Sequence, residues 1–413
     1  MTLQHQAFDR VGIGSQVRQS DFRKYRQVLS LSTKDNLVND AVSCAANTFN
    51  GACGLRYIQK GSRSICSVDS YPTILVLRKI ASNLSYLTRT TTSERNNLIK
   101  VLLAFLHEEV GFRVYRLDVS RFFDSLSIEQ AIAHVRTGAV TQKTCELLTF
   151  VLREHATTGR PGIPTGLAIS ATLAEVMMAS FDEYIRMQPN VFYFGRFVDD
   201  IIVITNGTED GSAFEKALSA ALPKGTHFGK KKRERIDIPK LDHGTSSGYA
   251  HFEYLGYAFA IRDEKTSKKQ SKRTVDVDLS DHSLTRLLTR TSKAFRAYRK
   301  DGRFDDLYLR ICYLTSNYRL FDPLVNRKRL AGIHHNHPFL TYHPGNSLRK
   351  LDEALRLLIF PSPQFRSTAG VSLNNQQKST LAARSFLLGH EKKQYYSFSI
   401  RSLALVKRCW FDG

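Results

Sequence analysis

The sequence lacks any apolar run of about 18 residues, the length that a membrane-spanning helix needs. Its first residues, MTLQHQAFDR, show no secretory signal pattern, and both absences predict a cytoplasmic protein. The six cysteines form no C-x-x-C pair, which argues against a zinc ribbon or a redox motif and favours reduced thiols. No internal repeat of fixed period is evident.

Acidic residues are scarce relative to basic ones. The 413 residues include 38 Asp and Glu against 60 Lys and Arg, which gives a formal charge of +22. Such an excess suits the phosphate backbone of a nucleic acid, although it would also suit an anionic membrane surface. We therefore expect a polynucleotide partner.

Two adjacent carboxylates, Asp199 and Asp200, lie between the apolar runs VFYF and IIVI. Residues of β-branched and aromatic type favour strands on both sides, so the short polar step predicts a β-hairpin with both carboxylates at its tip. Adjacent like charges repel, and a divalent cation is their natural counter-charge. A plain turn is the alternative, because aspartate is common in turns.

A third carboxylate upstream favours metal binding. The alternation of Tyr115, Leu117 and Val119 predicts a short strand with Asp118 near its end. Beside the hairpin, this strand would complete a three-carboxylate cluster. Such a cluster suits two Mg²⁺ ions about 3.5 to 4 Å apart, the arrangement used in phosphoryl transfer. The reaction implied is nucleotidyl transfer.

At this point the sequence resembles the reverse transcriptases. The segments similar to motifs A to E of that family follow in order: LDVSRFFDSL, GRPGIPTGLAISATLAE, FVDD, FGKKKRERI and FEYLGYAF. The resemblance implies an α+β right-hand fold with fingers, palm and an α-helical thumb. It also implies an RNA-directed DNA polymerase that uses Mg²⁺ and dNTPs.

The resemblance assigns roles to catalytic residues. Asp118, Asp199 and Asp200, together with the Val119 carbonyl, match the metal ligands. Lys232 is the best match to the lysine proposed to protonate pyrophosphate, and the adjacent Lys230 and Lys231 are the alternatives.

Phe123 lies where the family carries the bulky side chain that favours dNTPs over rNTPs. Core packing is the alternative for Phe123 and for its neighbour Phe122. Thr165 and Gly166 belong to the motif B loop on which the nascent base pair rests. Thr165 stands where many reverse transcriptases carry Gln.

Further nucleotide contacts are expected upstream. Residues 55 to 68 predict a hairpin that turns at Gly61 and presents Lys60 and Arg63 to a triphosphate. Arg78, on a predicted helix bordering the fingers, is another candidate. The alternative for each is a solvated surface charge.

We expect an N-terminal helical extension over residues 1–50, fingers and palm over 51–262, a basic linker or extended basic hairpin over 263–279, and a helical thumb and C-terminal region over 280–413. Helices are predicted over residues 16 to 48, 92 to 110, 167 to 185 and 212 to 221, from Ser280 to near Gly302 and after Asn346. Ser127 with Gln130, and Ser212 with Glu215, match capping boxes.

Basic residues after motif E predict contacts to nucleic acid, with a solvated basic face as the alternative. The candidates are Lys268, Lys269, Lys272, Arg273 and Arg296. His334, His335 and His337 look like a metal cluster, but no cysteine or carboxylate follows at ligand spacing. Contact with RNA, or a polar loop, is the favoured interpretation there.

The subfamily is indicated by what the chain carries and lacks. No integrase, HNH endonuclease or RNase H segment is evident, and the compact core, GIPTGLAIS and Leu-rich C-terminal part resemble bacterial abortive-infection and defence-associated (unknown-group) reverse transcriptases. This implies a structured noncoding RNA as template or scaffold and a DNA product, with self-association left open. The alternatives are untemplated protein-primed DNA synthesis, a retron-type enzyme, or a non-catalytic RNA-binding scaffold.

Overall fold

The computed structural model describes residues 6–61, 63–87, 94–230, 232–242, 247–267, 270–322, 327–361 and 372–411. The chain forms two compact units of mixed helix and strand. Unit 1 contains residues 1–98 and 110–240, and unit 2 contains residues 99–109 and 241–413. The fold class is α+β, as predicted.

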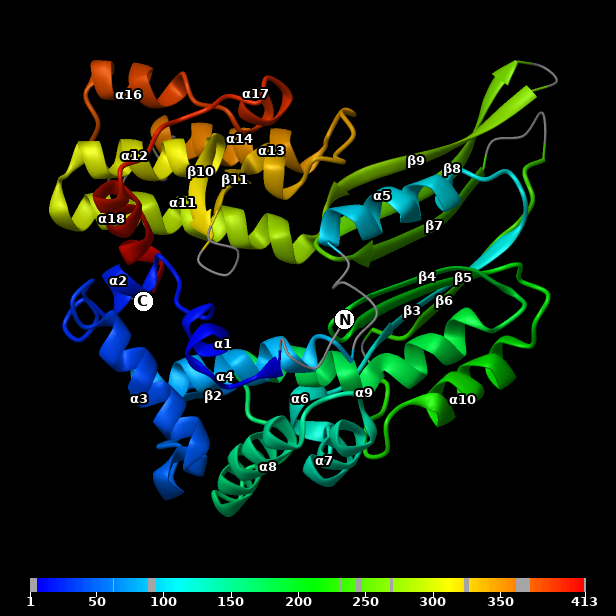
Figure 1. Ribbon diagram of the computed structural model, residues 1–413. Coiled ribbons are helices and arrows are strands. Elements are labelled where there is room, and N and C mark those ends of the chain that lie inside the picture. The colour runs from blue at the N-terminus through cyan, green and yellow to red at the C-terminus, as the bar shows by residue number, and fades with distance from the viewer. Residues whose placement is uncertain are drawn as a thin grey trace. The chain divides into compact units, whose positions relative to one another are not determined.

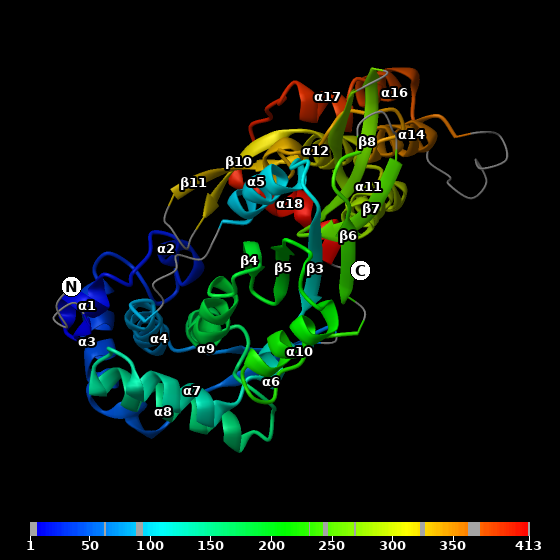
Figure 2. The same cartoon turned by 90° about the vertical axis from the view of Figure 1, so that its right-hand side faces the viewer.

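Unit 1 is built on a four-stranded antiparallel sheet in the order β4-β5-β3-β6 (Figure 2). The strands are β3 (Phe112–Asp118), β4 (Val191–Phe197), β5 (Asp200–Thr205) and β6 (Glu234–Ile238). Phe197 pairs with Asp200, so Val198 and Asp199 form the turn and the predicted hairpin is confirmed. The predicted strand that ends at Asp118 is also confirmed, and Asp118 pairs with Asp200.

Helices α9 (Ala168–Arg186) and α10 (Gly211–Ala221) pack against this sheet (Figure 1). Tyr115 of β3 contacts Phe214 of α10, with ring centroids 5.0 Å apart, and Leu117 joins the same core. Both helices were predicted within one residue at their first position. The proposed cap of α10 was wrong, because the Asp210 side chain, not that of Ser212, accepts the first backbone N–H groups.

The rest of unit 1 combines helices with a hairpin. Its further elements are α1 (Arg10–Gly14), α2 (Asp21–Lys24), α3 (Lys34–Ala46), η2 (Thr48–Gly51), β1 (Arg56–Lys60), β2 (Arg63–Ser67), α4 (Tyr71–Leu84), α6 (Phe122–Ser125), α7 (Ile128–Thr137) and α8 (Gln142–Thr157). The hairpin at Gly61 and the Ser127 cap are confirmed. The helix predicted over residues 16 to 48 is instead divided into α2 and α3. The helix predicted over residues 92 to 110 is α5 (Arg95–Leu106), whose residues from Ile99 onward belong to unit 2.

Unit 2 contains a three-stranded antiparallel sheet of β7 (Ser247–Tyr254), β8 (Tyr257–Ser267) and β9 (Gln270–Leu279). Residues 263–267 and 270–279 therefore pair as an extended hairpin and do not form a linker. Alternate residues of β9, including Val275, Val277 and Leu279, are buried, and this alternation favours a strand. Charged residues at the intervening positions made this alternation difficult to recognise in the sequence.

After its sheet, unit 2 continues with α11 (Asp281–Asp301), whose start after Ser280 and end at Gly302 match the predicted bounds. The elements that follow are α12 (Phe304–Thr315), β10 (Asn317–Asp322), β11 (Arg327–Gly332), α13 (Ile333–Asn336), α14 (Ser347–Ile359), α16 (Asn375–Ala382), α17 (Phe386–Glu391) and α18 (Ile400–Phe411). Among the described residues, no helix is both long and apolar enough to cross a membrane.

Candidate active site

Backbone pairing brings the predicted aspartates to one end of the unit 1 sheet. Asp118 ends β3, Asp200 begins β5, and Asp199 precedes it in the turn. The Val119 backbone N–H donates to the Asp199 carbonyl at 3.1 Å, which ties the end of β3 to the hairpin tip. Sheet register therefore positions both segments.

Lys232 approaches this end of the sheet from the segment before β6. Its Nζ donates to Oδ1 of Asp118 at 2.8 Å and to Oδ1 of Asp200 at 3.1 Å. The Asp118 carbonyl accepts the Gly229 backbone N–H at 2.8 Å, so this segment is also anchored through its backbone. The lysine assigned to motif D thus lies directly on two of the three predicted carboxylates.

The pKa values reflect burial and mutual repulsion. Burial raises the pKa of Asp199, and the charges of Asp200 and Asp118 raise it further. Burial likewise raises the pKa of Asp200, against the opposing effect of Lys232. Burial alone would lower the pKa of Lys232, but hydrogen bonds to Asp118 and Asp200 and their charges leave it raised. One ammonium faces three carboxylates, and negative charge is left over.

The donor atoms suit a divalent cation. Carboxylate oxygens are the ligands that Mg²⁺ prefers, and the ammonium at Asp118 and Asp200 shows that a positive charge is held there. However, no three His, Cys, Asp or Glu side chains converge as a metal-binding group in the part of the chain that the structure describes. The expected three-carboxylate cluster therefore takes the form of two carboxylates bridged by Lys232, with Asp199 beside them.

The hairpin tip depends on an arginine that the sequence interpretation missed. Val198 has a φ of 61°, a left-handed conformation that is unfavourable for a β-branched residue. Its carbonyl accepts a hydrogen bond from Nη1 of Arg196 at 3.0 Å. Arg196 is also held by both oxygens of Glu175 and of Asp182 on α9, and its side chain is only 4% exposed.

Burial would lower the pKa of Arg196, but the two carboxylates raise it. Its signal in the sequence is a basic residue inside an otherwise strand-like run. The helix before that run carries two acids seven residues apart, Glu175 and Asp182, and this spacing places both on one face.

Phe122 and Phe123 have separate environments. Phe122 is buried in the core, while Phe123 is half-buried and packs edge-on against it, with ring centroids 5.3 Å apart. The Phe123 carbonyl accepts the Ile163 backbone N–H at 3.0 Å, which ties the motif B loop to this segment. Phe123 therefore stays the candidate for contact with a sugar.

The motif B loop also contacts the β1–β2 hairpin. The Thr165 hydroxyl donates to the Ser64 carbonyl at 2.8 Å, and the Cys66 backbone N–H donates to the Thr165 carbonyl at 2.7 Å. Gly166 has a φ of 104°, and a Cβ there would lie 2.6 Å from the Cys66 carbonyl. Thr165 thus joins loop to hairpin, and only glycine fits the next position.

Of the two hairpin cations, Lys60 is exposed and opposite Arg63 in the strand register. The side chain of Arg63 is outside the described structure.

Arg78 is not available to a nucleotide. It is buried and donates to Oδ2 and Oδ1 of Asp21 at 2.6 and 3.0 Å, and to the Gln16 carbonyl at 3.0 Å. The interpretation as a nucleotide-binding residue is corrected, because this guanidinium supports the packing of α2 and α4.

Arg273 requires the same correction. Its side chain is 0% exposed and pairs with Asp263 of the adjacent strand, at 3.0 Å. It also donates to the Glu108 carbonyl at 2.8 Å. A buried, paired guanidinium does not contact phosphate. Lys272 and Arg296 are exposed, whereas Lys268 and Lys269 lie outside the described residues.

The histidines of unit 2 do not form a metal site among the residues described there. His334 packs against His390, with ring centroids 4.9 Å apart, and burial lowers the pKa of His334 to about 4. These rings belong to the packing around α13 and α17.

Comparison with known proteins identifies the family of the chain. The chain matches the family model described as reverse transcriptase (RNA-dependent DNA polymerase) over residues 19–259. That span includes Asp118, Asp199, Asp200 and Lys232. No curated protein matches significantly. Because the family match covers more than half of the chain and includes the aspartate cluster, the chain belongs to the reverse transcriptases, the RNA-directed DNA polymerases among the nucleotidyltransferases.

Proposed function

We propose that the chain synthesises DNA on an RNA template at Asp118, Asp199 and Asp200, with two Mg²⁺ ions as cofactors. The observation that carries this proposal is the contact of Lys232 with Asp118 and Asp200, at 2.8 and 3.1 Å, beside the hairpin tip. When bound, the two ions would stabilise the attacking and leaving oxygens of the displacement. The three carboxylates, with the Val119 carbonyl, are the residues that would hold them.

Lys232 has two properties that suit it to act on the leaving group. A lysine ammonium keeps its proton at neutral pH, and the side chain of Lys232 is 44% exposed and so able to change partners. A cation bound at the carboxylates would release Lys232 from them. Lys232 would then be a proton donor to pyrophosphate.

Nucleotide selection would fall to the residues around the motif B loop. Phe123 would exclude a 2′-hydroxyl, Gly166 would allow close approach of the backbone, and Thr165 would hold the loop on the β1–β2 hairpin. Lys60 and Arg63, opposite each other in that hairpin, would bind the triphosphate.

In terms of the right-hand fold, residues 51–262 would form fingers and palm, and the helices from Ser280 onward would form the thumb and C-terminal region. Support comes from the capped helix α11 and from the hairpin over residues 252 to 259 that matches motif E.

We further propose that the natural partner is a structured noncoding RNA, used as template or scaffold in defence against phage. Support comes from the charge of +22 and from the exposed Lys272 and Arg296. Binding that neutralises phosphates releases counterions, so affinity should fall steeply as salt rises.

The experiment gives the purified protein a primed RNA template, labelled dNTPs and Mg²⁺. Incorporation that follows the template sequence is expected, and incorporation without a template would contradict RNA-directed synthesis. Sequencing of copurified nucleic acid tests the partner: one defined RNA is expected, and heterogeneous cellular RNA would count against it.

A further inference from the structure

A cavity of unit 1 lies between α7, α8 and η2, and it shares no lining residue with the aspartate cluster. Its volume is about 1050 Å³, which is enough for a nucleotide-sized ligand. One stripe of α8 supplies most of its lining, including Glu146, Thr149, Phe150, Arg153 and Glu154. Spacings of three and four residues place these side chains along one side of the helix.

The acidic residues of this lining are already engaged. Glu154 accepts the backbone N–H groups of Cys53 at 2.6 Å and of Leu55 at 3.2 Å. Glu146 accepts hydrogen bonds from the Thr48 hydroxyl at 2.5 Å and from Nζ of Lys143 at 2.9 Å. Both carboxylates therefore hold the segment around η2 against α8.

The wall that they hold has a strained backbone. Thr48, Phe49 and Asn50 have φ angles of 48°, 59° and 50°, so three consecutive non-glycine residues are left-handed. Such conformations persist only where the surroundings fix them, and they are typical of functional sites. This wall of the cavity is thus preorganised.

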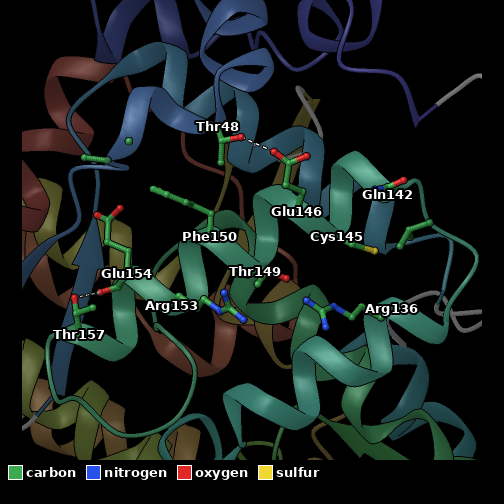
Figure 3. A pocket seen from close by; sticks show the side chains of 13 residues that line it. Thr48, Arg136, Gln142, Cys145, Glu146, Thr149, Phe150, Arg153, Glu154 and Thr157 are labelled. Carbon is green, nitrogen blue, oxygen red and sulfur yellow. Dashed lines mark hydrogen bonds between the residues drawn. The ribbon is translucent and has the colours of Figure 1, made fainter.

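Two arginines in the lining, Arg136 of α7 and Arg153 of α8, have no carboxylate partner among the described residues. Figure 3 shows their guanidinium ends pointing toward one another, on either side of Thr149. Both arginines are exposed, and an anion between them would pair with both guanidinium groups. Paired guanidinium forks are the groups that bind phosphate best, and the Thr149 hydroxyl offers another donor.

We propose that this cavity binds a nucleotide through a phosphate monoester, held by Arg136, Arg153 and Thr149. Phe150 offers an aromatic surface for the base, and its ring is fixed by stacking on Phe49, with centroids 5.8 Å apart. The ligand is a free nucleotide or the 5′-phosphate at the end of a nucleic acid strand, which share this chemistry. The proposal does not depend on polymerase activity.

Calorimetric titration tests the site with four probes: AMP, adenosine, and one hexanucleotide with and without a 5′-phosphate. EDTA in the buffer removes the divalent ions that nucleotide binding at the aspartates requires. We expect a phosphorylated probe to bind and its unphosphorylated partner to fail. Binding of AMP identifies a free nucleotide as the ligand, and binding of the phosphorylated strand alone identifies a strand end.

The variant Arg136→Gln with Arg153→Gln should bind the phosphorylated probe roughly 100-fold more weakly, about tenfold for each arginine. The matched control, Arg26→Gln, removes an exposed arginine outside the cavity and should bind like the wild type. Absence of binding by either phosphorylated probe, or undiminished binding by the double variant, would overturn the proposal.

Melting temperatures establish that the variants fold. If the double glutamine variant does not fold, Arg136→Lys with Arg153→Lys keeps both charges but loses both planar forks. Weaker binding by this lysine variant supports the proposal, and unchanged binding overturns it.

Discussion

The charge cluster around Arg196 and the one around Lys232 both belong to unit 1, yet they are completed in different ways. Arg196 is 4% exposed and uses all its N–H groups on two carboxylates and the Val198 carbonyl. Lys232 is 44% exposed and contacts one oxygen of each of two aspartates.

This difference separates a structural cluster from the one that we propose to be catalytic. A buried bidentate pair cannot be exchanged without leaving charge unpaired, whereas a flexible, half-exposed ammonium is replaced easily by another cation. The first cluster fixes the hairpin tip, and the second leaves oxygens of the aspartates available. The following changes should affect the two clusters differently.

The largest effect is expected from Asp199→Ala with Asp200→Ala. Loss of both carboxylates should lower the rate of dNTP incorporation by about 1,000-fold or more, because the charge that develops in the transition state is no longer stabilised. The fold should survive, since two repelling carboxylates are removed. Primer extension and a thermal melt measure the two outcomes.

Asp40→Ala is the matched control, because it removes an exposed carboxylate of α3. It should leave incorporation unchanged. Incorporation retained by a folded double variant would mean that catalysis uses other residues.

Arg196→Met should act on the fold as well as on activity. It leaves the buried Asp182 and the partly buried Glu175 without their partner, which should lower the free energy of unfolding by about 3–5 kcal/mol. Loss of the hydrogen bond to Val198 should also reduce incorporation. Urea denaturation gives the first quantity and primer extension the second.

Arg186→Met removes an exposed arginine of α9 that lies over the Phe194 ring. This change should lower the free energy of unfolding by no more than about 1 kcal/mol. An equal loss of stability in both variants would show that the Arg196 cluster has no special structural role.

Lys232→Met should reduce kcat by about 100-fold with little change in stability, because a general acid is lost while the fold does not depend on a half-exposed side chain. Single-turnover incorporation measures the rate. Lys230→Met, which removes an exposed lysine two residues away, should keep the wild-type rate. An equal loss of rate in both variants would mean that the effect comes from the loss of any positive charge in this segment and not from Lys232 as an acid.

The smallest effect is expected on the pH dependence of stability and concerns Asp21. Both of its carboxylate oxygens accept hydrogen bonds from Arg78. Burial alone would raise the pKa of Asp21, but hydrogen bonds from Arg78 and the Arg18 backbone, with the charge of Arg78, lower it. The pair therefore contributes stability above the unfolded pKa of about 4, and that contribution is lost as the pH falls through the lower folded value.

Urea denaturation at several pH values tests this dependence. Asp21→Asn should be less stable than the wild type at neutral pH, and the difference should shrink in acid. A difference that stays constant below about pH 4 would show that Asp21 does not titrate as a salt-bridged group.

Local patterns predicted much of the fold and the centre of the site. The hairpin at Asp199, the strand ending at Asp118 and the helix from Ser280 to near Gly302 all depend on residues near one another in sequence. Lys232 was identified through the family resemblance, and its contact with Asp118 joins residues 114 positions apart.

The errors arose where a charge is paired by a distant segment. Arg78 meets Asp21 across 57 positions, and Arg196 meets Glu175 and Asp182 on another element. Arg273 belongs to a strand whose alternation of buried and charged residues resembled a basic linker. Sequence alone does not separate a solvated cation from a buried, paired one, because tertiary packing decides which it becomes.

The central claim is that Lys232 occupies a site for divalent cations at Asp118 and Asp200. Titration with Mn²⁺, followed by electron paramagnetic resonance, tests it without any assay of polymerisation. We expect the wild type to bind Mn²⁺, Asp118→Asn with Asp200→Asn to bind at least tenfold more weakly, and Lys232→Met to bind more tightly because the competing ammonium is gone. Equal Mn²⁺ affinity in the wild type and the double asparagine variant would contradict the account.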